Sequence, residues 1–290
     1  MAMMNPYQPF VSAFARLVAD GKSLHLGGIP PHDQPRAAAD APVALIFSPH
    51  PDDECIVGGL ALRFLRENKM RVVNVAVTLG SDRQRRQPRL QELKNACDWI
   101  GFELELTAPN GLEKINPQTR TGDPAHWNAC VQTIAVSLAK NRPRAIFFPH
   151  ELDRHPTHIG THFLVLDALK TLPPDFQTTL IETEFWGQMP APNLMVESGV
   201  ENVAGLLAAL SFHVGEVRRN PYHLRLPAWL ADNVRRGAEL VGGQGGAAPD
   251  FMFATLYRTR QWNNGRVEEI FSGGRQIGVK ENPGDVFGWR

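Results

Sequence analysis

Residues 46–55 read IFSPHPDDEC, an apolar run that ends at a histidine and three consecutive acids. The apolar part is typical of a buried β-strand, and in open α/β sheets ligands bind just beyond the carboxyl ends of the strands. His50 and Asp53 stand three positions apart at this strand end, where they can turn toward one point and offer a nitrogen and an oxygen to a divalent metal. The stretch therefore predicts a metal site at the edge of a sheet.

The pattern on both sides of this stretch predicts the rest of the fold, because short β-branched runs alternate with longer amphipathic segments. The expected strands are residues 43–48, 71–78, 103–108, 144–150 and 178–186, and the expected helices are residues 55–67, 88–100, 125–140 and 158–172. Such alternation implies a Rossmann-like α/β fold, with a mostly parallel sheet and helices on both faces.

Two parts of the chain fall outside the alternation. Residues 1–40 contain one amphipathic helix near residues 9–19 and a Gly/Pro-rich connector, and we expect this segment to pack onto the core. Residues 186–290 are rich in Gly, Pro and aromatic side chains, which indicates an irregular lid or wall. The predicted organisation is an N-terminal helix and connector, followed by a single domain over residues 41–290 whose core spans residues 42–185.

Composition limits the partners of the chain. Its 30 basic side chains balance 30 acidic ones, so no overall field attracts nucleic acid or an anionic membrane. The three cysteines lie far apart without a Cys-x-x-Cys pair, which argues against a disulfide framework and a thiolate metal site. Residues 1–20 lack the pattern of a secretory signal, and no run of about eighteen apolar residues occurs. We therefore expect a cytoplasmic protein that binds a small molecule, and neither nucleic acid nor a membrane.

A histidine-rich segment supplies the remaining metal ligand. Residues 149–162 read PHELDRHPTHIGTH and follow another strand of the predicted sheet. Imidazoles and a carboxylate suit Zn²⁺, and three protein ligands leave a fourth position for water. His158 could act with His155 beside it, or with His162 at i, i+4 on the predicted helix. We favour the first arrangement, because Pro156 suits the start of that helix and places His158 at its mouth.

Other polar side chains near the predicted site have simpler explanations. His150 ends a strand and is expected either to support a ligand residue or to be structural, before being a ligand itself. Asp153 either orients a ligand histidine or caps the loop. Glu54 fits a carboxylate at a helix N-terminus better than a third ligand from one tight turn.

The motifs together resemble those of a known family. The stretch HPDDE at residues 50–54 with HPTH at residues 155–158 resembles the PIG-L/LmbE family of zinc-dependent de-N-acetylases. Lesser marks are VTLG at residues 77–80 and RLQELKNACDWIG at residues 89–101. The resemblance covers residues 42–185, and residues 204–262 resemble the C-terminal part of the family more loosely.

This resemblance implies roles for individual residues. It makes His50, Asp53 and His158 the ligands of one Zn²⁺ per subunit, and Asp52 the general base. It also assigns His155 to a second catalytic position. A separate substrate role, the recognition of sugar hydroxyls, falls to Arg89.

Two departures from the family pattern bear on the substrate. Thr157 stands where the family usually has Asp, but it is not at a ligand position. Asn110 replaces an acid and is expected to hydrogen-bond a sugar hydroxyl. In the C-terminal region, His213 and His223 are predicted to contact substrate, in the same subunit or in a neighbouring subunit of a homo-oligomer.

The implied reaction is hydrolysis of the N-acetyl amide of a small amino sugar, GlcNAc or N,N'-diacetylchitobiose, with release of acetate. Trp127, Trp186 and Trp229 could supply flat surfaces for the sugar, although burial in the core is the commoner fate of tryptophan. Two alternatives stay open: a metal-dependent amidase acting on a non-sugar amide or natural-product precursor, and a noncatalytic binder of sugar or nucleotide. The binder is disfavoured, because it gains little from an unliganded Asp52 beside a metal.

Overall fold

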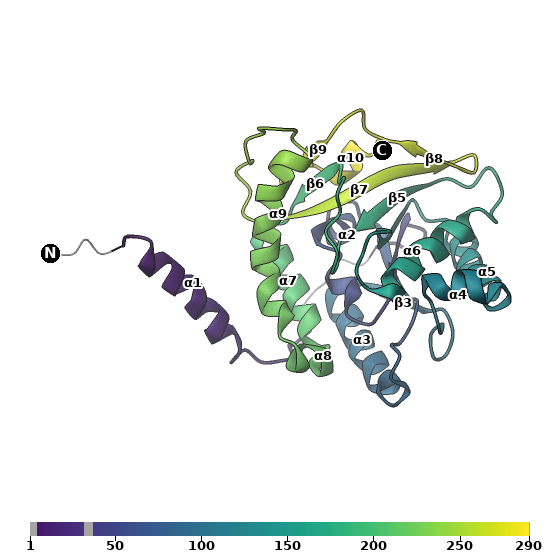
Figure 1. Ribbon diagram of the computed structural model, residues 1–290, viewed down its shortest axis with the longest axis horizontal. Coiled ribbons are helices and arrows are strands. Elements are labelled where there is room, and N and C mark those ends of the chain that lie inside the picture. Colours follow the sequence, from purple (N-terminus) through teal and green to yellow (C-terminus); the bar gives the residue numbers. More distant parts are fainter. Residues whose placement is uncertain (1–4, 32–36, 290) are drawn as a thin grey trace.

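The computed structural model describes residues 5–31 and 37–289 (Figure 1). Its strands are β1 (Val43–Ser48), β2 (Arg71–Ala76), β3 (Glu103–Leu106), β4 (Ala145–Pro149), β5 (Thr178–Thr183), β6 (Leu194–Glu197), β7 (Ala254–Asn263), β8 (Arg266–Glu269) and β9 (Arg275–Ile277). They form one nine-stranded sheet in the order β3-β2-β1-β4-β5-β7-β6-β9, with β8 paired to β7. The five strands from β3 to β5 are parallel to one another, as the sequence predicts.

The helices are α1 (Gln8–Gly21), α2 (Gly59–Arg66), α3 (Arg86–Ile100), α4 (Pro117–Gly122), α5 (Pro124–Asn141), α6 (Pro156–Leu169), α7 (Val200–Ser211), α8 (Val214–Arg219), α9 (Leu226–Leu240) and α10 (Pro283–Val286). Short 3₁₀ turns are η1 (Asp53–Cys55), η2 (Arg83–Arg85) and η3 (Tyr222–Arg225). None of the helices in the described part of the chain is long and apolar enough to cross a membrane.

Strand β1 explains why helices cover both faces of the sheet. Successive side chains of a strand point to opposite faces. Ala44 and Ile46 pack in one core with residues of α2, α3 and α7, while Val43, Leu45 and Phe47 pack in a second core with residues of α5 and α6. A strand buried on both faces reads as a continuous apolar run. The predicted α/β class with a mostly parallel sheet is therefore confirmed.

The C-terminal third is more regular than the predicted lid or wall. Strand β7 pairs antiparallel with β5 on one side and with β6 on the other, so this region extends the same sheet. Helices α7 and α9 belong to it as well (Figure 1). Strands β6 and β9 contain only four and three residues, too few to produce a periodic signal in the sequence.

The N-terminal helix does not pack onto the core as expected. Helix α1 extends away from the body of the molecule (Figure 1), and Phe10, Phe14 and Leu17 are 72%, 49% and 70% exposed. The prediction of packing was wrong for this helix, because other helices already cover both faces of the sheet. Its apolar stripe therefore has no open core face to join. The connector does pack: Leu26 lies against the core, and the Gly27 N–H donates to Ser211 Oγ at 3.2 Å.

The order of the strands brings the predicted site loops together. Because β1 lies between β2 and β4, the loops that leave these three strands meet at one edge of the sheet. Thr78 Oγ1 donates a hydrogen bond to the Pro49 carbonyl at 2.7 Å, which joins the ends of β2 and β1. The Leu112 N–H donates to the Val77 carbonyl at 2.8 Å and adds the loop after β3.

Candidate metal centre and catalytic site

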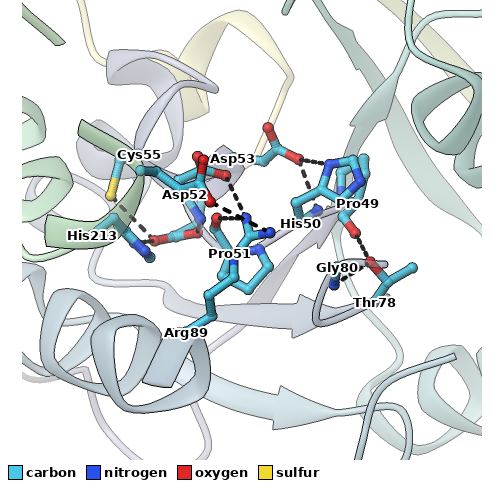
Figure 2. Close-up of polar contacts among 12 residues, drawn as sticks. Pro49, His50, Pro51, Asp52, Asp53, Cys55, Thr78, Gly80, Arg89 and His213 are labelled. Atoms are coloured by element: carbon cyan, nitrogen blue, oxygen red, sulfur yellow. Dashed lines mark hydrogen bonds and ion pairs between the residues drawn. The ribbon is translucent and has the colours of Figure 1, made fainter. Parts of the chain in front are cut away.

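The loop after β1 turns two adjacent aspartates toward different partners (Figure 2). Asp52 has a φ of 114°, a left-handed conformation that is costly for a residue other than glycine. Its N–H donates to Glu54 Oε2 at 2.9 Å, and Arg89 Nη2 donates to the Pro51 carbonyl at 2.9 Å. These hydrogen bonds hold the turn, and Asp53 can face the histidines while Asp52 faces elsewhere.

Three side chains bring possible ligand atoms together beside this turn. His50 Nδ1 lies 3.4 Å from Asp53 Oδ2 and 3.2 Å from His158 Nε2. His158 Nε2 in turn lies 3.4 Å from Asp53 Oδ2. Zinc–ligand bonds of about 2.0–2.1 Å in tetrahedral geometry separate neighbouring ligand atoms by about 3.3–3.4 Å. The triangle therefore has the size that a tetrahedral divalent cation requires.

The surroundings of the two histidines also suit a metal. Burial lowers the pKa of His50 to about 3 and that of His158 to about 4, so both rings are neutral near pH 7 and keep a lone pair for a metal. His158 is fully buried in the first turn of α6. Asp153 Oδ1 lies 3.5 Å from His158 Nδ1, where a carboxylate can orient a ligand histidine. The donor atoms, their spacing and this support fit a divalent cation.

His155 completes a cluster of three histidines. Its ring centroid lies 4.7 Å from that of His50 and 5.1 Å from that of His158, and one ring nitrogen of each lies within 4.8 Å of the others. As the N-cap of α6, His155 accepts a hydrogen bond at Nδ1 from the Thr157 N–H at 3.2 Å. In the neutral ring the proton is then on Nε2, the nitrogen left to face a ligand.

Asp52 stands beside the ligand triangle without belonging to it. The Tyr222 hydroxyl donates to Asp52 Oδ2 at 2.6 Å, and Arg89 Nη2 lies 3.7 Å from Oδ1. Burial and the neighbouring charge of Asp53 raise the pKa of Asp52 to about 7. A carboxyl group with a pKa near neutrality can exchange protons at neutral pH. The site thus combines a metal-sized set of ligands with a candidate general base.

Comparison with known proteins bears on this arrangement. Residues 45–169 match the family model described as PIG-L, GlcNAc-PI de-N-acetylase. The matched region runs from β1 to the end of α6. The resemblance read from HPDDE and HPTH is therefore confirmed. No match was found among curated protein sequences.

Solved structures share the fold at low sequence identity. The conserved protein TT1542 from Thermus thermophilus is 17% identical, with 76% of this chain and 94% of that chain covered and a TM-score of 0.55. The 4-carboxy-2-hydroxymuconate hydratase GalB from Pseudomonas putida KT2440 is 14% identical and has a TM-score of 0.56, with 75% of this chain and 95% of that chain covered. The N,N'-diacetylchitobiose deacetylase from Pyrococcus horikoshii is 16% identical and has a TM-score of 0.53, with 89% of this chain and 94% of that chain covered. Because a hydratase and a deacetylase share this fold, the reaction has to be argued from the site.

The region that matches the family model does not contain every residue around the site. His213, at the start of α8, lies fully buried with Nε2 2.6 Å from Glu54 Oε1. Burial would raise the pKa of Glu54 and lower that of His213, but their mutual attraction outweighs burial, so the pKa of Glu54 is lowered and that of His213 is raised. The pair lies behind the Asp52 turn, where Glu54 also accepts from the Asp52 N–H.

This position corrects the prediction that His213 contacts substrate. A ring that is 0% exposed and bonded to Glu54 of the same chain has no surface to offer a sugar. His223 is 7% exposed, and burial lowers its pKa. Its predicted substrate contact stays a prediction.

Arg89 and Asn110, the two predicted sugar-binding residues within the matched region, differ in their surroundings. The Arg89 guanidinium is engaged by the Pro51 carbonyl and lies 3.8 Å from Glu216 Oε1. Asn110 is exposed, next to Gly111, whose backbone bridges to Thr78 at the edge of the site. Their roles toward a sugar therefore stay predictions.

The other two histidines of residues 149–162 have structural contacts. His150 Nε2 donates to the Gly187 carbonyl at 2.8 Å, and His162 Nδ1 donates to the Pro149 carbonyl at 3.0 Å. Both side chains are buried. These contacts agree with the preference for His155 and His158 as the histidines of the site.

Sequence reasoning missed Tyr222 altogether. Tyr222 is separated from Asp52 by 170 positions and lies in a segment without strand–helix alternation. No local pattern connects the two residues. The one local signal is its neighbour His223, a predicted substrate contact in the segment NPYHL.

Proposed function

We propose that the protein is a metal-dependent N-deacetylase that hydrolyses the N-acetyl amide of a GlcNAc-containing small molecule and releases acetate. One observation carries the proposal: an unliganded carboxylate, Asp52, stands next to a triangle of ligand atoms 3.2–3.4 Å apart. Hydrolysis of an amide needs both an electrophilic centre and a base, and a binding protein needs only the first.

His50, Asp53 and His158 would hold the metal, and their two nitrogens and one oxygen favour Zn²⁺. When bound, such a metal lowers the pKa of a water molecule and polarises the acetyl carbonyl. None of the three cysteines belongs to this set of ligands. They are free and buried, which is compatible with a reducing compartment such as the cytoplasm.

Asp52 would take the proton from the attacking water. Its Oδ2 already accepts the Tyr222 hydroxyl, so Oδ1 is the oxygen left for the water. The water oxygen adds to the carbonyl carbon, and the C–N bond then breaks. A proton passes to the departing nitrogen, so that the products are acetate and the free amino sugar.

His155 would act on the carbonyl oxygen and on the leaving amine. Its Nε2–H can donate to the carbonyl oxygen as negative charge develops there. In its protonated form it can also supply the proton that the leaving amine needs. Arg89 would support Asp52 and, with Asn110, bind the hydroxyls of the sugar.

The substrate proposal is supported by the family and by its structural relatives. The family model is named for a GlcNAc-containing lipid, and two neighbours are titled N,N'-diacetylchitobiose deacetylase and deacetylase in teicoplanin biosynthesis. We place GlcNAc and N,N'-diacetylchitobiose first. An amide on a natural-product precursor is the second candidate, because the teicoplanin enzyme has the same fold with a TM-score of 0.51.

The test is acetate release from both sugars by metal-stripped protein, with and without added Zn²⁺. We expect zinc to restore release and Asp52→Asn to abolish it while zinc still binds. Near-normal turnover by Asp52→Asn would remove Asp52 as the base. No release from either sugar would exclude them as substrates and direct the assay to other acylated amines.

A further inference from the structure

A cavity adjoins the metal centre and is not used by the mechanism above. It has a volume of about 630 Å³ and is lined by residues 151–154, residues 186–188 and Ile159. The two loops that form it follow β4 and β5. They pack so closely that only a glycine fits at position 187, because a Cβ there would lie 2.7 Å from the Leu152 carbonyl oxygen. The cavity is therefore a formed feature of the fold.

Asp153 connects this cavity to the metal centre. Its Oδ1 lies 3.5 Å from the ligand His158, and its Oδ2 accepts from the backbone N–H groups of Trp186 and Gly187 at 3.1 and 3.2 Å. Arg154, on the wall, immediately precedes His155. One carboxylate thus lies between the loops that line the cavity and the ligand triangle.

The lining pairs exposed apolar surface with unused polar groups. Trp186 is 52% exposed and Leu152 is 57% exposed, although large apolar side chains are more stable when covered. The side chains of Glu151, Arg154 and Gln188 also line the cavity and make no hydrogen bond or ion pair with other described residues. A flat apolar surface ringed by donors and acceptors suits a ligand with an apolar face and hydroxyl groups at its rim.

Charge narrows the class of ligand further. Glu151, Asp153 and Arg154 all line the cavity, so the lining has no excess of positive charge to hold a phosphate or another anion. A neutral pyranose ring meets both requirements, because its C–H face can lie on the indole while its hydroxyls reach the polar side chains.

The indole is also linked to the proposed base. The rings of Trp186 and Tyr222 meet edge to face with centroids 5.8 Å apart, and the Tyr222 hydroxyl donates to Asp52. A ring lying on Trp186 would therefore extend from a unit whose amide is held near Asp52.

We infer that this cavity, which we call the Trp186 subsite, binds the sugar ring attached to the unit that is deacetylated. The inference rests on the proposed function and makes a disaccharide or longer glycan the preferred substrate over free GlcNAc. Trp186 and Leu152 are then residues that determine specificity.

The test compares kcat and KM for GlcNAc and N,N'-diacetylchitobiose in wild type, Trp186→Ala and Leu152→Ala. We expect wild type to prefer the disaccharide by about tenfold or more in kcat/KM, as the loss of well-placed apolar contacts in a pocket implies. Both variants should lose most of that preference through a raised KM for the disaccharide, with GlcNAc turnover changed less than about twofold. Equal kcat/KM for the two sugars in wild type would overturn the inference.

Two controls separate this role from other effects. Met252→Ala removes another exposed apolar side chain, 67% exposed beside a second cavity at α9, and should leave both sugars unaffected. Trp186→Ala could act through Tyr222, which would lower kcat for both sugars equally. Leu152→Ala leaves that tyrosine untouched. The subsite would be refuted if Leu152→Ala kept the preference for the disaccharide while Trp186→Ala lowered kcat equally for both sugars.

A binding measurement keeps the inference testable if the proposed function fails. Calorimetric titration of metal-stripped protein with N,N'-diacetylchitobiose and with GlcNAc requires no turnover. We expect about tenfold tighter binding of the disaccharide, and loss of the difference in Trp186→Ala. Equal affinities would refute the subsite, whereas a clear difference without acetate release would refute only the deacetylase reaction.

Discussion

The buried pair of Glu54 and His213 makes the strongest prediction about stability. His213→Ala removes one partner and leaves the Glu54 carboxylate 0% exposed with its Oε1 unpaired by histidine. Breaking a buried ion pair by removing one partner costs about 3–5 kcal/mol of unfolding free energy. For a domain of this size, about 2–4 °C of melting temperature corresponds to each kcal/mol. We therefore expect His213→Ala to melt about 6–20 °C lower than wild type.

The assay is thermal and urea unfolding of metal-stripped protein, with His223→Ala as the matched control. His223 is buried to a similar extent, but its Nδ1 has no hydrogen-bond partner among the described residues. Its loss should cost only about 1–2 kcal/mol. In the double variant Glu54→Gln/His213→Ala, the neutral amide removes the unpaired charge, so the total loss should be smaller than the sum of the single losses.

The pair also predicts how this stabilisation varies with pH. The pKa of Glu54 is lowered from 4.5, so its contribution is present above pH 4.5 and is lost as pH falls through the folded pKa. The pKa of His213 is raised from 6.5, so its contribution is present below pH 6.5 and is lost as pH rises through the folded pKa. The difference between wild type and His213→Ala should therefore be largest between pH 4.5 and 6.5. If His213→Ala costs no more than His223→Ala across this window, the reasoning is wrong.

Three further predictions concern the proposed reaction site. Tyr222→Phe removes the hydrogen bond to Asp52 Oδ2, and a hydrogen bond to a charged group is worth about 1.5–3 kcal/mol. Steady-state kinetics should therefore show kcat reduced by about tenfold or more, with KM little changed. An unchanged kcat would show that the hydroxyl does not support the base. Gly80→Ala should lower the free energy of unfolding in urea by about 1–2 kcal/mol, because Gly80 has a φ of 88°. It should also weaken sugar binding, because a Cβ there would lie 2.5 Å from Arg89 Nη1. A fully stable variant with normal KM would contradict this. Asp153→Asn should weaken zinc affinity by about 10–100-fold in competition with a chelator, whereas equal affinity would mean that this carboxylate does not orient the ligand histidine.

The parts of the site that sequence reasoning located share one physical property. His50 and Asp53 end one strand, while His158 begins the helix that follows a parallel strand of the same sheet. Strand ends that face the same edge of a parallel sheet must lie together, so the meeting of these residues follows from local patterns and one topological rule. The short turn after β1 likewise forces adjacent acids to diverge.

The parts that it did not locate depend on contacts between distant elements. Helix α1 was expected to pack because its stripe is amphipathic, but the sequence does not reveal that other helices already occupy the core faces. His213 and Glu54 are 159 positions apart, and neither their residue types nor their spacing shows that they form a buried pair.

The sequence by itself determined the fold class, the resemblance to the PIG-L family and the residues proposed as metal ligands, because periodicity and a strand-end motif act over a few neighbouring positions. Only the tertiary structure decided that the residue before α8 is the histidine beneath the Asp52 turn, that Tyr222 binds the proposed base, and that Trp186 stands exposed beside the metal centre. These contacts depend on how the antiparallel C-terminal strands and their helices close against the parallel half of the sheet. That closure is set by the packing of whole elements, which no local pattern in the chain records.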